Sequence, residues 1–148
     1  MTAAGTVLIV DDNPNDIDLL QIALDDAGLH PDIRSAADGR AAIAVLRHIA
    51  EDDHSWRPDV VVLDLNMPIA NGHEVLAYIR SDPRLTALPV LVLTTSDAPS
   101  DRQRCLAQGA QAYLVKPRRF SEFEPIITRI RAYIDHPGTP APTAVDRP

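Results

Sequence analysis

The sequence predicts a doubly wound α/β fold, in which helices cover both faces of a five-stranded parallel sheet. Five short apolar runs alternate with five stretches of helical periodicity along the 148 residues, and this alternation is typical of such sheets. The runs at 7–10 and 60–63 consist of branched apolar residues without polar alternation, as expected for strands that are buried on both faces. A chain of this length can bury one core, so we expect a single domain.

The apolar runs and the stretches of helical periodicity predict the individual elements in chain order. Strands are expected at 6–10, 31–36, 59–63, 89–94 and 111–115, and helices at 14–28, 38–53, 71–82, 99–109 and 120–135. The first helix has Asn13 as a candidate cap, Pro14 at its first position and Gly28 at its end. The last helix has one apolar face that should cover the sheet, with Ser121 and Glu124 as a candidate capping box.

Two segments stand outside this pattern. The segment 51–58 is a polar insertion before the third strand and contains the only tryptophan, Trp56. We expect its ring to pack beneath the loop, the alternative being a surface for a partner. Residues 137–142 contain three prolines and have little to bury, so we expect a domain over 1–136 and a Pro-rich, mobile C-terminal tail over 137–148.

Composition excludes several classes of function. The net charge of -7 argues against nonspecific nucleic-acid binding, which requires a basic surface. The single cysteine, Cys105, excludes an internal disulfide and a thiolate metal cage, and we expect it to be a small buried side chain. The five histidines show no ligand spacing. The apolar runs are too short to span a bilayer and no leader precedes Thr6, so we expect a soluble, cytoplasmic protein without membrane contact.

Polar side chains follow four of the predicted strands. Asp11 and Asp12 follow the first strand, Asp64 the third, Thr94 ends the fourth and Lys116 follows the fifth. In open parallel sheets, ligands bind beyond the carboxyl ends of the strands. Two carboxylates about 4 Å apart repel by roughly 4 kcal/mol in a surface-like medium. A hard divalent cation relieves that repulsion, and oxygen ligands favour Mg²⁺. Asp12 is the better candidate for a direct ligand, with Asp11 acting through water or positioning the ion.

Magnesium usually shares its coordination with a phosphoryl group, and a carboxylate beside it can accept that group as an aspartyl phosphate. Asp64 is the best candidate acceptor, because it stands alone at the end of the central run. Lys116 can then neutralise the phosphoryl charge and Thr94 can donate a hydrogen bond to it. Each residue taken singly has an ordinary explanation as a helix cap, a turn or a surface lysine. Their joint placement at one sheet edge favours the ionic site.

These residues also stand in a recognisable order, and the chain resembles the receiver domain of two-component response regulators over about residues 6 to 135. The motifs that carry the resemblance are Val10-Asp11-Asp12, Asp64-Leu65-Asn66-Met67-Pro68 followed by Gly72, Leu93-Thr94, and Gly109-Ala110 leading to Tyr113 and Lys116-Pro117. The resemblance implies a flavodoxin-like (βα)5 fold with Asp64 as the phosphoacceptor and Lys116 as its phosphoryl partner. It further implies Mg²⁺ at Asp11, Asp12, Asp64 and the backbone carbonyl of Asn66, a switch pair of Thr94 and Tyr113, and a cis Lys116–Pro117 bond.

Finer features look similar to the single-domain regulators that partner bacterial phytochrome kinases. These features are residues 12–16, the insertion before Pro58, and residues 93–97. The resemblance implies a sensor histidine kinase as the phosphoryl donor, with a bacteriophytochrome as the candidate, and a downstream protein target. It also implies a homodimer formed through the last helix, the last strand and the C-terminal extension. Such a protein is not an enzyme in the usual sense, because it catalyses only its own phosphorylation and slow dephosphorylation.

Three rival functions share parts of this pattern. An aspartate-nucleophile phosphatase also places a carboxylate and Mg²⁺ at a strand end, but it has a second acid two residues later, where this chain has Asn66. A flavodoxin-like cofactor binder has a phosphate loop after the first strand, and the acidic residues 11–16 would repel that phosphate. A receiver-like interaction module that is never phosphorylated would not need the site residues, and all of them are present.

Overall fold

A computed structural model describes residues 5–52, 56–67 and 69–136 of the chain. Its elements in order are β1 (Thr6–Val10), α1 (Pro14–Asp26), β2 (Asp32–Ala36), α2 (Gly39–Glu51), β3 (Val60–Leu63), α3 (Gly72–Ser81), β4 (Val90–Thr94), α4 (Pro99–Ala107), β5 (Ala112–Val115), the 3-10 turn η1 (Phe120–Phe123) and α5 (Glu124–Asp135). The predicted fold class is therefore confirmed. The predicted tail, 137–148, lies outside the described residues.

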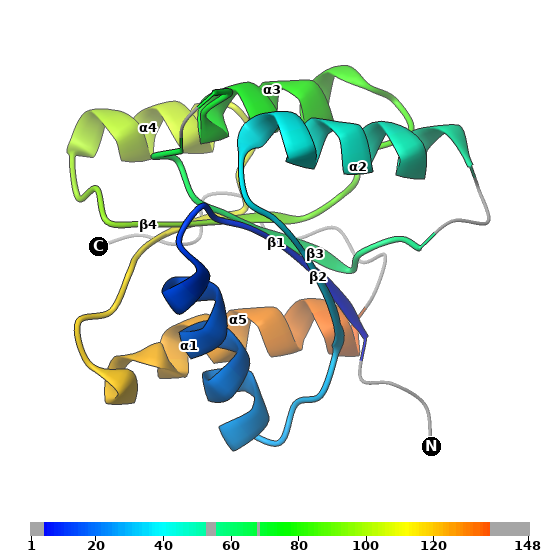
Figure 1. Cartoon of the computed structure of the whole chain (residues 1–148). Coiled ribbons are helices and arrows are strands. Elements are labelled where there is room, and N and C mark those ends of the chain that lie inside the picture. The colour runs from blue at the N-terminus through cyan, green and yellow to red at the C-terminus, as the bar shows by residue number, and fades with distance from the viewer. Residues whose placement is uncertain (1–4, 53–55, 68, 137–148) are drawn as a thin grey trace.

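All five strands form one parallel sheet in the order β2-β1-β3-β4-β5. Helices α2, α3 and α4 cover one face, and α1 and α5 cover the other (Figure 1). The sheet and these helices enclose two apolar clusters, one on each face. The chain is thus doubly wound, and its strand order reverses between β1 and β3, which lie side by side. The carboxyl ends of these two strands mark the crevice in which such sheets bind ligands.

The uninterrupted apolar runs explain which strands are central. All four residues of β3 and all five of β4 are buried, whereas β2 at the sheet edge is largely exposed. Each fully buried Val or Leu side chain contributes roughly 1.5–3 kcal/mol to the hydrophobic stabilisation. The central strands are therefore firmly held, and the residues that follow them are positioned by a rigid scaffold.

The predicted cap of the first helix is confirmed, and the predicted start of the last helix is wrong. The Asn13 side chain accepts a hydrogen bond from the Asn15 amide at 3.0 Å, with Pro14 at the first helical position. The last helix, predicted as one element, begins instead with the 3-10 turn η1, and Pro125 in the first turn of α5 has no N–H to donate to the turn before it. The expected Ser121–Glu124 capping box does not form. Glu122 instead accepts from the Arg119 amide at 3.2 Å.

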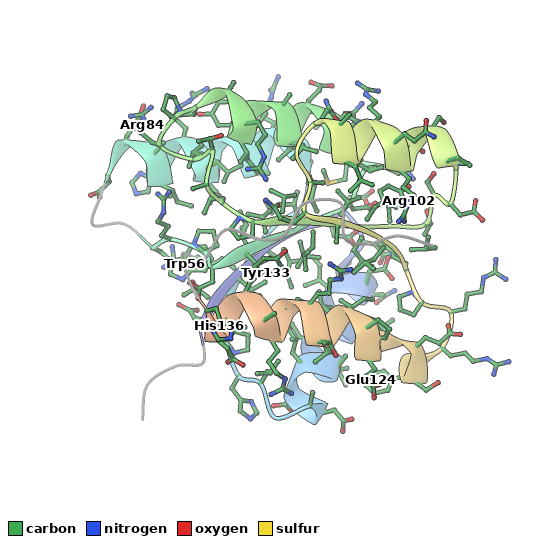
Figure 2. The ribbon with its side chains drawn as sticks, turned by 180° about the vertical axis from the view of Figure 1, so that it is seen from behind. Trp56, Arg84, Arg102, Glu124, Tyr133 and His136 are labelled. Carbon is green, nitrogen blue, oxygen red and sulfur yellow. The ribbon has the colours of Figure 1, made fainter. Side chains whose placement is uncertain are left out.

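Trp56 packs against the protein, as predicted (Figure 2). Its ring contacts the core cluster beneath α2 and α3. The indole N–H donates to the Asp32 carboxylate at 2.9 Å, and the Arg34 guanidinium lies 4.7 Å from the ring centroid. These contacts favour the packing interpretation over a partner surface. Cys105 is fully buried, as expected. Within the described ranges, every helix is too short or too polar to cross a membrane.

Candidate functional site

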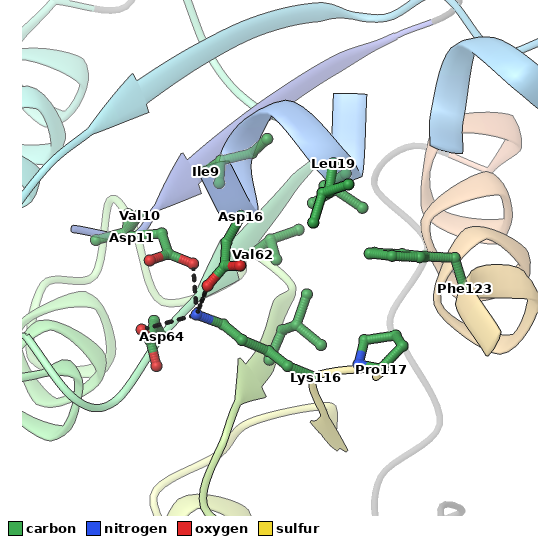
Figure 3. Close-up of a pocket in the computed structure, with 12 residues that line it drawn as sticks. Ile9, Val10, Asp11, Asp16, Leu19, Val62, Asp64, Lys116, Pro117 and Phe123 are labelled. Carbon is green, nitrogen blue, oxygen red and sulfur yellow. Dashed lines mark hydrogen bonds and ion pairs between the residues drawn. The ribbon is translucent and has the colours of Figure 1, made fainter. Parts of the chain in front are cut away.

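Three backbone hydrogen bonds position the side chains that follow the strands. The hydrogen-bond ladder of the sheet continues one residue past the ends of β1 and β3. The Asp11 amide donates to the Ala36 carbonyl at 3.0 Å, and the Asp64 amide donates to the Val10 carbonyl at 2.9 Å. The Lys116 amide donates to the Thr94 carbonyl at 2.7 Å. The three side chains therefore project from the ends of β1, β3 and β5 toward one point (Figure 3). This is the edge at which the sequence predicted an ionic site.

The carboxylates of Asp11, Asp12 and Asp64 form a group of hard oxygen donors. One oxygen from each lies within 4.8 Å of the other two. Asp11 and Asp64 are buried, whereas Asp12 is exposed. Oxygen donors at this spacing, with one side open to water, suit Mg²⁺, which keeps part of its hydration shell. The donor set therefore fits the cation that the sequence predicted.

Lys116 occupies the centre of the site. Its ammonium nitrogen lies 2.8 Å from Asp11, 2.7 Å from Asp16 and 3.1 Å from Asp64, and its side chain is only 12% exposed. An ammonium group has three protons to donate, and these three carboxylates can accept all of them. Asp16 was not predicted as a site residue. Its signal was its position four residues before Leu20, which places it on the buried stripe of α1.

Burial and the surplus of negative charge shift the pKa values of Asp11 and Lys116. Burial raises the pKa of Asp11 above its ordinary value, and its hydrogen bonds with Lys116 and the Asn13 amide offset that only in part. Burial alone would lower the pKa of Lys116, but the hydrogen bonds to Asp11 and Asp16 and the charge of Asp64 outweigh burial and raise it. The raised pKa of Lys116 follows from the three carboxylates that contact its ammonium group. The lysine is firmly charged and the cluster retains an excess of negative charge.

Asn66 connects Thr94 to Asp64. The Thr94 side chain is fully buried, and its hydroxyl oxygen accepts from the Asn66 side-chain amide and from the Ser96 amide, each at 3.4 Å. The Asn66 backbone amide donates to Asp64 at 3.3 Å. The hydroxyl of Thr94 is therefore tied to both the acceptor loop and the loop that follows β4.

Tyr113 lies behind that second loop. Its ring is 2% exposed and its hydroxyl donates to the Ser96 carbonyl at 2.7 Å. Burial raises the pKa of this phenol. The Ser96 hydroxyl in turn donates to Asp101 of α4 at 2.6 Å. Tyr113 is thus buried and connected through Ser96 to α4.

Gly72 has a structural role beside the site, and the Lys116–Pro117 bond differs from the expectation. A Cβ on Gly72 would overlap the Asp64 carbonyl oxygen, so the glycine permits the first turn of α3 to approach the acceptor strand. The Lys116–Pro117 bond is trans, so the implied cis bond is wrong. The two isomers of a bond before proline differ little in intrinsic energy, and the residues themselves do not distinguish them.

Comparison with known proteins gives a consistent result. Residues 7–128 match a family model described as the response regulator receiver domain. Response regulator Rcp1 of Synechocystis sp. is 34% identical over 127 residues, which cover 86% of each chain. The probable methanogenesis regulatory protein FilR2 of Methanothrix harundinacea is 36% identical over 127 residues, covering 86% of this chain and 81% of that one.

Solved structures show the same likeness. The phosphorylated cyanobacterial phytochrome response regulator RcpA superposes with a TM-score of 0.78 at 35% identity, over 89% of this chain and 94% of that one. The Mn²⁺-bound form of Rcp1 superposes with a TM-score of 0.75 at 34% identity, over 86% of this chain and 92% of that one.

Proposed function

Because this chain belongs to the response-regulator receiver family, we propose that it is a single-domain response regulator whose Asp64 accepts a phosphoryl group from a sensor histidine kinase. One observation carries the proposal: a buried carboxylate at the end of the central strand is bound by a lysine and flanked by two further carboxylates. A protein of this kind acts in signalling and not on an external substrate. Its similarity to Rcp1 over 86% of that chain supports the single-domain assignment.

The reaction is a phosphoryl transfer. A carboxylate oxygen of Asp64 attacks the phosphorus of a phosphohistidine, and the P–N bond breaks as the new O–P bond forms. The imidazole leaves with the electron pair of the broken bond and takes up a proton. Lys116 follows the transferred charge and donates to a phosphoryl oxygen, and the Thr94 hydroxyl donates to another. Lys116 already contacts Asp64, and Thr94 is connected to it through Asn66.

Asp11, Asp12, Asp64 and the backbone carbonyl of Asn66 would hold Mg²⁺. The ion, when bound, neutralises charge on the phosphoryl oxygens. Asp12 is the exposed member of the group and would bind directly, whereas buried Asp11 would act directly or through water. The Mn²⁺-bound form of the relative Rcp1 supports a divalent cation in this chain.

The switch would use the connections around Ser96. Phosphorylation would give the buried Thr94 hydroxyl a new acceptor. That hydroxyl accepts from the Ser96 amide, and the Ser96 carbonyl accepts from the Tyr113 hydroxyl. Movement of Thr94 would therefore be transmitted to Tyr113 and, through the Ser96 hydroxyl, to Asp101 of α4. This is a two-state element biased by a newly introduced charge.

Exposed apolar side chains beside the site suggest where the kinase binds. Leu19 and Ile22 of α1 and Phe120 of η1 are all exposed. Leu19 lines the same pocket as Asp64 and Lys116. An exposed apolar patch next to an acidic site suits contact with a protein partner. A phytochrome kinase is the candidate partner, because the similar RcpA is described as a phytochrome response regulator.

Two further parts of the proposal concern assembly and location. We propose a homodimer formed through α5, β5 and the C-terminal extension, because Val115 of β5 at the sheet edge exposes an apolar side chain. A downstream protein would bind the phosphorylated form through a remodelled α4–β5–α5 face. The cytoplasm is the proposed location, where a kinase domain would meet this protein.

Incubation with acetyl phosphate and Mg²⁺ tests the proposed acceptor role. A covalent adduct that is stable to acid, labile to hydroxylamine and missing in Asp64→Asn supports it. Formation of no adduct would refute it and leave a receiver-like interaction module. Many turnovers of phosphate release per chain, without a stable adduct, would instead indicate the aspartate-nucleophile phosphatase.

A further inference from the structure

Asp16 binds the site lysine without belonging to the cation-binding group. Its carboxylate makes the shortest of the three contacts with the Lys116 ammonium, at 2.7 Å (Figure 3). The other two partners, Asp11 and Asp64, are members of the oxygen group suited to a divalent ion, and Asp16 is not. The Asp16 side chain is 30% exposed and lies in the first turn of α1. The lysine is therefore shared between the cation site and a carboxylate at its rim.

A divalent cation and the lysine compete for the same oxygens. Lys116 lies 2.8 Å from Asp11 and 3.1 Å from Asp64, so an ion held by these carboxylates would come close to an ammonium of the same sign. Repulsion between the two cations at this range is strong in a partly buried site. The ammonium must therefore move away from Asp11 when the ion binds. Of its three carboxylate partners, only Asp16 lies outside the group that the ion would occupy.

We propose that Asp16 is a positioning residue that holds the Lys116 ammonium at the rim of the site while a divalent cation occupies the group formed by Asp11, Asp12 and Asp64. This inference rests on the part of the proposed function in which these carboxylates bind a divalent cation. Asp16 offers the lysine a second acceptor, so that it clears the cation site without moving into solvent. The lysine then remains within reach of a phosphoryl group on Asp64. Without Asp16, the lysine would compete with the ion for Asp11 and Asp64, and an ion that binds would displace it into solvent.

The sequence provides a matched control in the same helix. Asp18 is exposed and lies two residues after Asp16, on a different side of α1. Asp16→Asn and Asp18→Asn therefore remove the same charge from the same helix, but only the first changes a contact of Lys116. Asp16→Glu keeps the charge on a longer side chain.

Magnesium affinity is the first readout, measured by isothermal titration of the full chain and without phosphorylation. Asp16→Asn is expected to weaken Mg²⁺ binding by about three- to tenfold, because it removes one charge near the ion and leaves the lysine on the ligands. Asp18→Asn should bind Mg²⁺ as the parent chain does, and Asp16→Glu should recover most of the affinity. Equal effects of the two asparagine variants, or an Asp16→Asn affinity that is unchanged or tighter, would overturn the proposal.

The second readout follows the lysine itself. Lys116 is the only lysine in the chain, so selective isotope labelling gives one side-chain ammonium resonance that needs no assignment. In the parent chain, saturating Mg²⁺ should shift this resonance while its protons stay protected from exchange, because Asp16 still accepts from them. In Asp16→Asn the Lys116 ammonium protons should exchange rapidly with water when Mg²⁺ is added, and the resonance should disappear. Loss of the signal in the Mg²⁺-saturated parent chain would show that the lysine enters solvent and would overturn the proposal even if no variant folds.

These measurements separate the two proposals. A chain that binds Mg²⁺ with the expected Asp16 dependence, but forms no adduct on Asp64, retains the positioning role and loses the acceptor role. A chain that forms the Asp64 adduct, but shows no Asp16 dependence, loses only the positioning role.

Discussion

The crowding of carboxylates predicts that the cation-free protein becomes more stable when one of the acidic charges is removed. Asp12→Asn is the cleanest test, because Asp12 is exposed and its change to asparagine preserves shape. Two unit charges 4.8 Å apart repel by about 3.5 kcal/mol at an effective dielectric constant of about 20. Water screens an exposed carboxylate, and the positive end of α1 offsets a few tenths of a kcal/mol, so a gain of about 1 kcal/mol is expected.

Thermal unfolding followed by circular dichroism measures this gain. In the absence of Mg²⁺, Asp12→Asn should raise Tm by about 2–4 °C, the shift expected for about 1 kcal/mol in a domain of this size. Mg²⁺ at one hundred times its Kd should stabilise the parent chain by about 2.7 kcal/mol, and Asp12→Asn should lose most of that response. Asp18→Asn, outside the group, should change neither quantity. A lower Tm for Asp12→Asn without Mg²⁺, or a full Mg²⁺ response in it, would refute the reasoning.

The pH dependence of this stability has a definite sign. The pKa of Asp11 is raised above its ordinary value of 3.8, chiefly by burial, so the folded state binds that proton more tightly than the unfolded state does. The contribution of Asp11 to stability therefore falls as pH rises from about 3.8 through the raised pKa, and the full cost is present above that pKa. Mg²⁺ binds the ionised form, so its stabilising effect should weaken on acidification below neutral pH. A Mg²⁺ effect that grows on acidification would contradict this sign.

Three further predictions concern the surroundings of the site. Gly72→Ala should lower the free energy of unfolding by about 1–3 kcal/mol, because the new methyl group overlaps the Asp64 carbonyl; urea unfolding measures this, and unchanged stability would contradict the close approach. Tyr113→Phe should cost about 1 kcal/mol in the same assay, because the Ser96 carbonyl loses its 2.7 Å partner; a neutral effect would count against that bond. Cys105 should resist a thiol reagent at pH 8 until urea unfolds the chain, because it is fully buried and burial raises its pKa to about 11; rapid labelling of the native protein would contradict its burial.

The sheet was predictable because its central strands, β3 and β4, are buried on both faces. A run of branched apolar residues such as those of β3 has few other uses in a chain of this size, and each predicted strand agrees with the structure within a residue at either end. Helix ends were less accurate, since the prediction extended α1 to Gly28 whereas the helix ends at Asp26. The last turn of a helix and its cap contain the same polar and small residues, so the pattern does not mark the boundary.

The site was predictable only for the residues whose positions follow directly from the strand ends. The side chains after β1, β3 and β5 must meet at one edge of the sheet, and Asp11, Asp64 and Lys116 do so. The contact of Asp16 with Lys116 joins residues one hundred positions apart and depends on where the first turn of α1 lies relative to the residue that follows β5. The inward position of Tyr113 and the role of Ser96 likewise depend on the packing of the loop after β4, which periodicity does not encode.

Residue-level mapping of the phosphoryl group tests the central claim most directly. The chain is incubated with acetyl phosphate, with and without Mg²⁺, and the modified residue is identified by tandem mass spectrometry after exchange of the acyl phosphate with hydroxylamine. We expect one modified residue per chain, Asp64, and only when Mg²⁺ is present. Modification of another residue, or of Asp64 at the same rate with Mg²⁺ removed by a chelator, would contradict the account.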